Sequence, residues 1–219
     1  MFPKEIHMGI QERKIRHKED LRKRILEAAK KLFLTAGYEA TSIRKIAKEI
    51  EFSPTTIYLY YKDKSDIIYA LHQEGFQMMR QSFQPLMQVE SPFERLKALG
   101  KCYINFAFTH PDFYELMFVM KDPMEHLEIN CVEAEWEEGE RVFDFLLQTV
   151  RDCQDEGYFN GLDSTHVAME AWASVHGMCA LYVSGHLRSM MNVVFGNENQ
   201  ERMIEDAFRV LVHYLESTK

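Results

Sequence analysis

The chain has 219 residues and a formal net charge of −8 at pH 7, and 46% of its residues are hydrophobic. This composition is typical of a globular protein with a sizeable apolar core, and no apolar run is long enough to predict a membrane span. The first residues lack the apolar stretch of a signal peptide, and the four cysteines are widely spaced without a C-x-x-C pair, which together indicate a cytoplasmic protein with reduced thiols.

The charge is distributed unevenly along the chain. Residues 1–64 carry 15 Lys and Arg against 9 Asp and Glu, an excess of +6, whereas residues 65–219 carry 11 against 25, an excess of −14. A basic segment joined to an acidic one indicates a head that binds nucleic acid and a body with another role. A chance cluster of solvated lysines is the alternative, but the basic segment coincides with the helical motif described next.

The N-terminal part is predicted to be an arm followed by one helix. Residues 1–16 read as a flexible arm whose basic side chains could reach DNA phosphates or simply keep the protein in solution. From about Lys18 to Ala36, apolar residues recur at helical spacing. Gly37 is a residue type that ends helices, because it adopts the left-handed conformation without strain.

Two short helices joined by a tight turn are predicted next. Thr41 or Ser42 can cap the first helix, and Ser53 followed by Pro54 is a typical start for the second. The second helix, predicted to end at Tyr61, is too short to stand alone and needs a partner helix beneath it. The predicted core of this three-helix unit consists of Phe33, Ile43, Ile46, Ile57 and Tyr61.

This stretch resembles the DNA-binding domain of the TetR family of transcriptional regulators. The matching residues lie between Leu21 and Lys64, and the most specific part is the run T-I-Y-x-Y-Y-x-x-K that begins at Thr56. The resemblance implies a helix-turn-helix domain over residues 17–63, whose second helix lies in a DNA major groove. It also implies an effector-binding and dimerisation domain over residues 64–219, and a helix after Lys64 whose movement transmits effector binding to the head.

Side chains on and near the second helix are candidates for DNA contact. Threonine methyl groups can pack on thymine methyl groups, and tyrosines can contact sugars and phosphates. No arginine, asparagine or glutamine lies on this helix, so the usual bidentate readers of guanine and adenine are missing. The candidate DNA contacts are Thr41, Ser42, Arg44, Lys45, Pro54, Thr55, Thr56, Tyr58, Tyr60 and Lys64.

The rest of the chain is predicted to be helical. Asp63 with Asp66 would cap a helix that runs to about Phe83, and the S-x-x-E box at Ser91 would open the next. Further helices are predicted over residues 92–109, 112–120, 124–156, from 163 to about 187, and 200–216. No alternating β-branched run is bounded by turn residues. The predicted fold is therefore all-α, with about nine helices in a small three-helix head and a larger helical-bundle body.

One segment of the body carries a second resemblance. Trp172, His176 and Gly177 match the Trp and His-Gly positions that mark one class of TetR-type C-terminal domains. The family resemblance implies that such a body binds a small effector.

The body is rich in aromatic and methionine side chains, which suit an adaptable apolar pocket but also an ordinary core. We expect a hydrophobic or aromatic effector. His176 could hydrogen-bond it or be a satisfied core histidine, and the acidic residues around Trp136 could favour a cation or form a solvated helix face. The candidate effector contacts are Tyr103, Phe106, Phe113, Phe118, Trp136, Phe143, Met169, Trp172 and His176.

The last two predicted helices are the candidate dimer surface. Helix-turn-helix proteins gain affinity by dimerising, with two recognition helices about 34 Å or a multiple of it apart. Small and apolar residues permit close packing in a four-helix bundle made by two chains, although packing on the chain's own body is the alternative. The residues concerned are Ala173, Gly177, Ala180, Val183, Ser184, Gly185, Phe208 and Val212.

The sequence therefore predicts a ligand-responsive transcriptional regulator, most often a repressor in the family it resembles. It would bind a palindromic double-stranded DNA operator as a homodimer and be released by a small effector. The alternatives are a DNA-binding or protein-interaction module without sequence preference and an all-helical enzyme. Because no H-E-x-x-H, G-x-S-x-G, P-loop or G-x-G-x-x-G motif occurs, we expect no enzyme and no cofactor. Only His166 and Glu170 form a helical pair at metal-ligand spacing, so no metal site is predicted.

Overall fold

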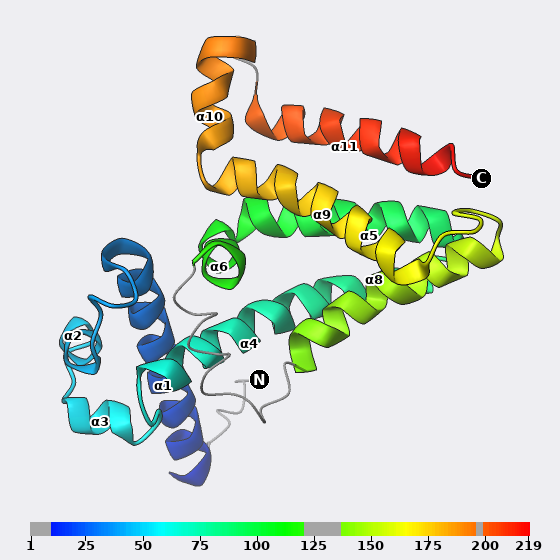
Figure 1. Ribbon diagram of the computed structural model, residues 1–219. Helices are drawn as coiled ribbons and strands as arrows, with labels where there is room; N and C mark the ends of the chain where they lie inside the picture. The colour runs from blue at the N-terminus through cyan, green and yellow to red at the C-terminus, as the bar shows by residue number, and fades with distance from the viewer. Residues whose placement is uncertain (1–9, 121–136, 196–198) are drawn as a thin grey trace, which may run out of the picture. The chain divides into compact units, whose positions relative to one another are not determined.

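The computed structural model describes residues 10–120, 137–195 and 199–219 (Figure 1). These residues form ten α-helices with a few short 3-10 or π-helical turns and contain no strand, which confirms the predicted all-α fold. The described chain divides into two compact units, which we call the head, ending at Leu71, and the body, beginning at His72. The division lies inside one helix rather than at Lys64, where the sequence predicted the domain boundary.

None of the helices in the described segments combines the length and the apolar character needed to cross a membrane.

The head is a three-helix unit completed by the start of a fourth helix. α1 spans Ile10–Ala36, α2 spans Ile43–Glu49, α3 spans Pro54–Tyr58 and α4 spans Lys64–Phe83. The core predicted from the sequence is confirmed, because Phe33, Ile43, Ile46, Ile57 and Tyr61 are all buried. The first turns of α4 add three further buried residues, Ile67, Ile68 and Leu71.

Serine caps start both helices of the helix-turn-helix, as predicted. Ser42 Oγ accepts the backbone N–H of Lys45 at 3.3 Å, and Ser53 Oγ accepts that of Thr56 at 3.2 Å. Each cap pairs one backbone N–H that the first helical turn leaves without an intrahelical partner.

The turn between α2 and α3 is made without glycine. Glu51 has a left-handed φ of 61°. Its N–H bonds to the carbonyl of Lys48, and the N–H of Phe52 bonds to the carbonyl of Ala47. This Schellman arrangement ends α2 and turns the chain towards α3.

Two helix boundaries in the head differ from the prediction. α1 begins at Ile10, so the second half of the expected arm is helical, although its described side chains from Ile15 to Asp20 are exposed. α3 ends at Tyr58 instead of Tyr61. The sequence marks which residues face inward, but it does not show where the last helical hydrogen bond forms.

Two arginines of α1 hold the second half of the motif. Arg22 Nε donates to the Tyr61 hydroxyl at 3.1 Å, and an Arg24 guanidinium nitrogen donates to the carbonyl of Ile50 at 3.0 Å. The Arg24 guanidinium also lies 5.3 Å from the centroid of the Phe52 ring. These contacts tie the turn and the end of the motif to the longest helix of the head.

The body is built from the remainder of α4 and the helices that follow it. They are α5 Pro92–Thr109, α6 Pro111–Tyr114, α8 Glu137–Asp155, α9 Ser164–Val183, α10 His186–Met190 and α11 Gln200–Glu216, with the short turns η1 Gln84–Gln88, η2 Glu115–Val119 and η3 Met191–Phe195. In Figure 1, α5, α8 and α9 pack on one another and α11 lies along α9. The predicted ends of α4, α5 and α11 are confirmed. Residues 124–136, predicted to begin the helix now seen as α8, lie outside the described segments.

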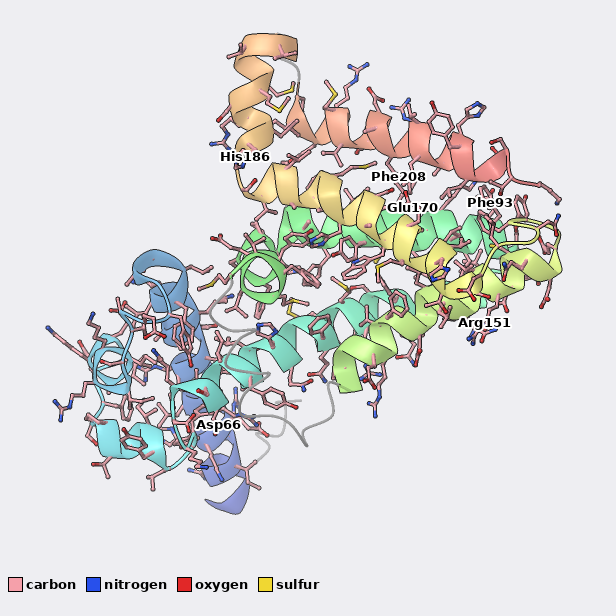
Figure 2. The ribbon with its side chains drawn as sticks, in the orientation of Figure 1. Asp66, Phe93, Arg151, Glu170, His186 and Phe208 are labelled. Atoms are coloured by element: carbon pink, nitrogen blue, oxygen red, sulfur yellow. The ribbon has the colours of Figure 1, made fainter. Side chains whose placement is uncertain are left out.

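Aromatic packing joins the body helices. The rings of Phe93 and Tyr158 stack with centroids 4.6 Å apart. On α5, Gly100 lies directly against the ring of Phe208, which Figure 2 shows on the side of α11 that faces α9 and α5. A Cβ at Gly100 would be 2.6 Å from that ring, so the close approach of α11 and α5 requires glycine at this position.

Not every predicted cap is formed. Ser91 precedes α5, but its side chain makes no cap hydrogen bond, and Glu94 instead pairs with Lys97 one turn later. Pro92 alone pre-sets the first turn of the helix. The expected caps at Asp63 and Asp163 are confirmed by hydrogen bonds from the following backbone N–H groups.

The predicted helix over residues 163–187 is interrupted near its end. α9 stops at Val183, and Gly185, with φ of 75°, turns the chain into the short helix α10. The glycine permits this left-handed conformation, which other residues adopt only with strain.

Within the body, the later turns of α4 pack on η2. Gly75 lies against Met117, and the ring of Phe76 meets that of Phe118 edge-on at 5.6 Å. His72 is almost completely buried, and in the described part of the chain neither of its ring nitrogens has a hydrogen-bond partner of good geometry. Burial lowers the pKa of His72 to about 4, against a smaller opposing effect of the Leu116 backbone.

We predict that Gly100→Ala destabilises the body, because the new methyl group overlaps the Phe208 ring. Overpacking of this kind typically costs ~1–3 kcal/mol, less the ~1 kcal/mol that alanine gains in a helix. Denaturant unfolding should therefore show a loss of up to about 2 kcal/mol. The matched control is Gly100→Ala combined with Phe208→Leu. If the double variant is destabilised by the full sum of the single changes, the two sites do not touch as described.

We predict that His72 makes the protein less stable as the pH falls. The pKa of His72 in the folded state lies below its unfolded value of 6.5, so the unfolded chain binds the proton first. The contribution of neutral His72 to the free energy of unfolding is complete above pH 6.5 and is lost between pH 6.5 and 4. The free energy of unfolding should fall by about 2 kcal/mol from pH 7 to pH 5. A His72→Leu variant should lack this part of the dependence in denaturant titrations. A variant with the same slope as the natural chain would contradict the assignment.

Candidate functional site

The helix-turn-helix exposes one compact set of side chains on α3 and at the residue directly after it. Thr55, Tyr58 and Leu59 are exposed, with 57% of Tyr58 and 75% of Leu59 open to solvent. Ile57, between them in the chain, is fully buried. α3 therefore presents a fixed outer surface that is neutral, with apolar and hydroxyl groups.

Most of the other predicted DNA contacts border this surface. Ser42, Arg44 and Lys45 are exposed, and Pro54, Thr56, Tyr60 and Lys64 are half-buried. Some of their polar groups already have partners within the head. Thr56 Oγ1 lies 2.9 Å from Ser53 Oγ, and Lys45 Nζ donates to the carbonyl of Ala40 at 2.5 Å.

Lys64 also has a role inside the head. Its ammonium group donates to the carbonyl of Tyr38 at 2.7 Å and lies 3.9 Å from the centroid of the Tyr38 ring. These contacts join the start of α4 to the loop after α1. Changing Lys64 would therefore disturb the head as well as remove a positive charge.

Thr41 differs from the expectation. It is buried, and its hydroxyl donates into the head, to the carbonyls of Gly37 at 2.8 Å and Leu32 at 3.2 Å. Its side chain closes the loop before α2 and is not available to a phosphate. Conversely, Leu59 was not among the predicted contacts. Its place could have been predicted, because Ile57 lies on the inner face and a residue two positions later lies on the outer face.

The body contains an apolar cavity of about 440 Å³. Its size lies within the range of ~300–1,000 Å³ that is usual for small-molecule sites. α4, α5, η2, α8, α9 and α11 all contribute to its wall. The lining residues are Phe76, Met79, Phe83, Phe93, Leu96, Lys97, Leu99, Gly100, Tyr103, Phe118, Gly139, Glu140, Val142, Phe143, Asp144, Leu146, Met169, Ala171, Trp172, Val175, Phe208, Leu211, Val212 and Leu215.

The structure brings together only part of the predicted effector site. Five of its residues line the cavity, namely Tyr103, Phe118, Phe143, Met169 and Trp172. Phe106 and Phe113 are buried away from it, and Phe113 packs against Gly75 instead. His176 lies behind Tyr103, and Trp136 is outside the described segments. The contributions of α4 and α11 were missed, although both helices show apolar residues at helical spacing.

A hydrogen-bonded cluster lies where α5, α6 and α9 meet. The Tyr103 and Tyr114 hydroxyls are 2.9 and 2.8 Å from His176 Nδ1. Tyr114 also donates to the His176 carbonyl at 3.1 Å, and Trp172 Nε1 donates to the Tyr103 hydroxyl at 3.3 Å. Trp172 and Tyr103 belong to the cavity wall, so the cluster connects the cavity with His176.

Every titratable group of this cluster is neutral near pH 7. Burial raises the pKa of both tyrosines, raises the pKa of the nearby Cys179 thiol to about 12, and lowers the pKa of His176. The charged lining residues are instead Lys97, Glu140 and Asp144, of which the two carboxylates are exposed.

The predicted dimer surface is only partly exposed. Ala173 and Gly177 are exposed on α9, and beyond the adjoining backbone of α9 no atom of the described residues lies within 4 Å of a Cβ placed at Gly177. Leu181 on α9 and both Val210 and Tyr214 on α11 are also exposed.

Two members of the predicted dimer surface face the other way. Phe208 is buried against Gly100, and Val212 lines the cavity. Both lie on the inner face of α11, one helical turn apart, whereas Val210 and Tyr214 lie on its outer face.

Two family models match the chain. Residues 96–207, which are 112 of the 219, match the model described as Tetracyclin repressor-like, C-terminal domain, and residues 25–71 match that of bacterial regulatory proteins of the tetR family. The chain belongs to the TetR family of transcriptional regulators. The resemblance read from the helix-turn-helix and from Trp172, His176 and Gly177 is thereby confirmed. The family consists of regulators and not of enzymes, which removes the enzyme alternative.

Individual members of the TetR family are more distantly similar. The HTH-type transcriptional regulator SAR2658 of Staphylococcus aureus (strain MRSA252) is 38% identical over 90 residues, which cover 41% of this chain and 49% of that protein. The chain thus spans about half the length of this curated relative.

Solved structures agree over most of the chain. The fatty acid degradation regulator FadR from Bacillus halodurans has a TM-score of 0.68 at 15% identity, covering 87% of this chain and 94% of that one. A protein of unknown function from Rhodococcus sp. RHA1 has a TM-score of 0.66 at 20% identity, covering 97% and 99%. At such identities the likeness establishes the fold alone.

Proposed function

We propose that this regulator binds a palindromic operator as a homodimer in the cytoplasm and acts as a repressor that a small apolar effector releases. The observation that carries the proposal is that residues of α4 take part in both units. Ile67, Ile68 and Leu71 on this helix complete the core of the head, while Phe76 and Met79 line the cavity of the body. One helix thus takes part in both the unit that would bind DNA and the unit that would bind the effector.

The outer surface of α3 supports sequence-dependent DNA binding. Thr55, Tyr58 and Leu59 offer methyl groups, a ring and an isobutyl group, which suit thymine methyl groups in the major groove. Arg44 and Lys45, exposed on α2, are placed to contact phosphates and set the register. We therefore propose a half-site that contains thymines at the positions facing α3.

The cavity supports an apolar effector. Because almost all of its wall is hydrocarbon, burial of an apolar ligand would stabilise the complex by about 25 cal/mol for each Å² removed from water. Phe118 connects the cavity with α4, since its ring borders the cavity and packs edge-on against Phe76. A ligand that displaces Phe118 would change the packing of α4 in the body.

Effector release follows from linkage. The effector lowers operator affinity only if it binds better to the form of the protein that does not fit the operator. The same coupling free energy then acts in both directions, so operator DNA must weaken effector binding by the same factor.

The exposed apolar residues of α9 and α11 support dimerisation through these helices. Leu181, Val210 and Tyr214 would be covered in a four-helix bundle of two chains, and Gly177 would permit close approach. A chain that remained monomeric would keep these side chains in water.

The alternative is a module that binds DNA without sequence preference. Selection of random duplex DNA by the purified protein at physiological salt, followed by sequencing, separates the two. We expect enrichment of a palindrome whose half-sites are one helical turn or a multiple apart. Retention of all sequences with a strong salt dependence would support the alternative.

We predict that Tyr58→Ala weakens binding to the selected operator at least tenfold, because one base or sugar contact per half-site is worth ~1–3 kcal/mol. Fluorescence anisotropy with labelled duplex measures the affinity. The matched control is Thr41→Val, which removes a buried hydroxyl and should lower the stability of the head by about 1 kcal/mol while leaving operator affinity nearly unchanged. If Thr41→Val weakens binding as much as Tyr58→Ala, α3 is not the reading helix.

We predict that Leu181→Glu converts the dimer to a monomer, because it places a charge in the proposed four-helix interface. Analytical ultracentrifugation at micromolar concentration measures the mass. Leu162→Glu is the matched control, since Leu162 is similarly exposed, at 57% against 45%, but lies before α9. A Leu181→Glu variant that stays dimeric would place the interface elsewhere.

A further inference from the structure

One neutral hydrogen-bonded cluster includes two residues of the cavity lining. Tyr103 and Trp172 both line the cavity, and the indole N–H of Trp172 donates to the Tyr103 hydroxyl. Trp172 and His176 are one helical turn apart on α9, so both side chains meet the same tyrosine. The Tyr103 hydroxyl is therefore the neutral polar group that joins the cavity lining to His176.

When His176 is the tautomer that leaves Nδ1 without a hydrogen, two hydroxyl groups compete for one acceptor in this cluster. A neutral histidine nitrogen without a hydrogen has one lone pair and accepts one hydrogen bond. Tyr103 and Tyr114 are both within 2.9 Å of His176 Nδ1. When Tyr114 donates to Nδ1, the hydrogen of Tyr103 is free to turn to a ligand oxygen, and His176 still has its partner. In the absence of ligand, Tyr103 can donate to Nδ1 while Tyr114 donates to the His176 carbonyl.

The electrostatics of the cavity do not suit an anion. Among the described residues of the lining, Lys97 is the only cation, and its ammonium group already pairs with Glu94 and lies 5.6 Å from the Phe93 ring centroid. Glu140 and Asp144 on the lining are acidic. A carboxylate bound next to Tyr103 would be buried without a countercharge, which is costly. The cluster around His176 is neutral and supplies hydrogen bonds only.

We infer that the effector is an uncharged, mostly apolar molecule with one oxygen acceptor, a carbonyl or a hydroxyl, that accepts a hydrogen bond from Tyr103. Its role as an effector rests on the proposed function, whereas its binding does not. Trp172 and His176 are positioning residues in this site, because they hold the tyrosine whose hydroxyl contacts the ligand. This gives a physical role to two of the three residues by which the body resembles its class.

Three probes of nearly equal shape test this inference. Methyl naphthyl ketone, isopropenylnaphthalene and naphthoate carry a carbonyl, a hydrocarbon and a carboxylate group on the same ring system. Equilibrium dialysis at pH 7.5 against the full chain without DNA measures the affinity of each. We expect the ketone to bind and naphthoate to bind at least about tenfold more weakly.

Two matched variants locate the hydrogen bond. Tyr103→Phe should lower the ratio of ketone affinity to hydrocarbon affinity roughly fivefold, the worth of one neutral hydrogen bond. Tyr182→Phe is the matched control and should leave this ratio unchanged, because Tyr182 does not line the cavity and its hydroxyl donates to Glu201.

Three results would overturn the inference. They are equal binding of naphthoate and ketone, an unchanged affinity ratio in Tyr103→Phe, and binding of none of the probes. The first and third results are measured on the natural chain alone, so they test the inference even if the Tyr103→Phe variant does not fold. Operator affinity, measured in the same samples, tests the proposed function separately. Probes that bind with the expected pattern and leave operator affinity unchanged would contradict effector release and not the site.

Discussion

The structure depends on the continuity of α4. A helix of 20 residues is about 30 Å long and does not bend freely. Its first turns are locked into the head by Ile67 and Ile68, and Lys64 fixes its start to the loop after α1. Its later turns are held in the body by Gly75 and Phe76 against η2. Residues of α4 are thus buried in both units.

The cavity lies among the helices of the body. Helices that pack against one another through large side chains leave space between them. Gly100 lets Phe208 approach on one side, and on the other Phe118 lines the cavity together with Phe76 of α4, against which its ring packs. Most of the wall is hydrocarbon, and at Tyr103 it adjoins a neutral cluster that is kept uncharged by its own burial. An apolar ligand with one uncharged oxygen would satisfy both parts of this wall, and its binding free energy would act next to the helix shared by both units.

The sequence predicted the helices, the serine caps and the core of the head, because periodicity and cap residues are local signals. It did not predict that Thr41 turns inward or that the side chain of Ser91 leaves its helix uncapped, since these depend on which partner lies within reach in space. The aromatic residues of the body were recognised, but Phe106 and Phe113 are packed solid while Phe76 and Leu211 border the cavity. Periodicity shows which face of a single helix is buried. A cavity forms where the side chains of several helices leave space between them, and this depends on how the helices pack in three dimensions.

The most direct test of the central claim is a linkage measurement on the full chain. Operator affinity is measured with and without a saturating cavity ligand, and the affinity of that ligand is measured with and without saturating operator. We predict that both affinities fall, and by the same factor. If ligand affinity is the same on free and operator-bound protein, the cavity and the DNA-binding head are not coupled, and effector release as proposed does not occur.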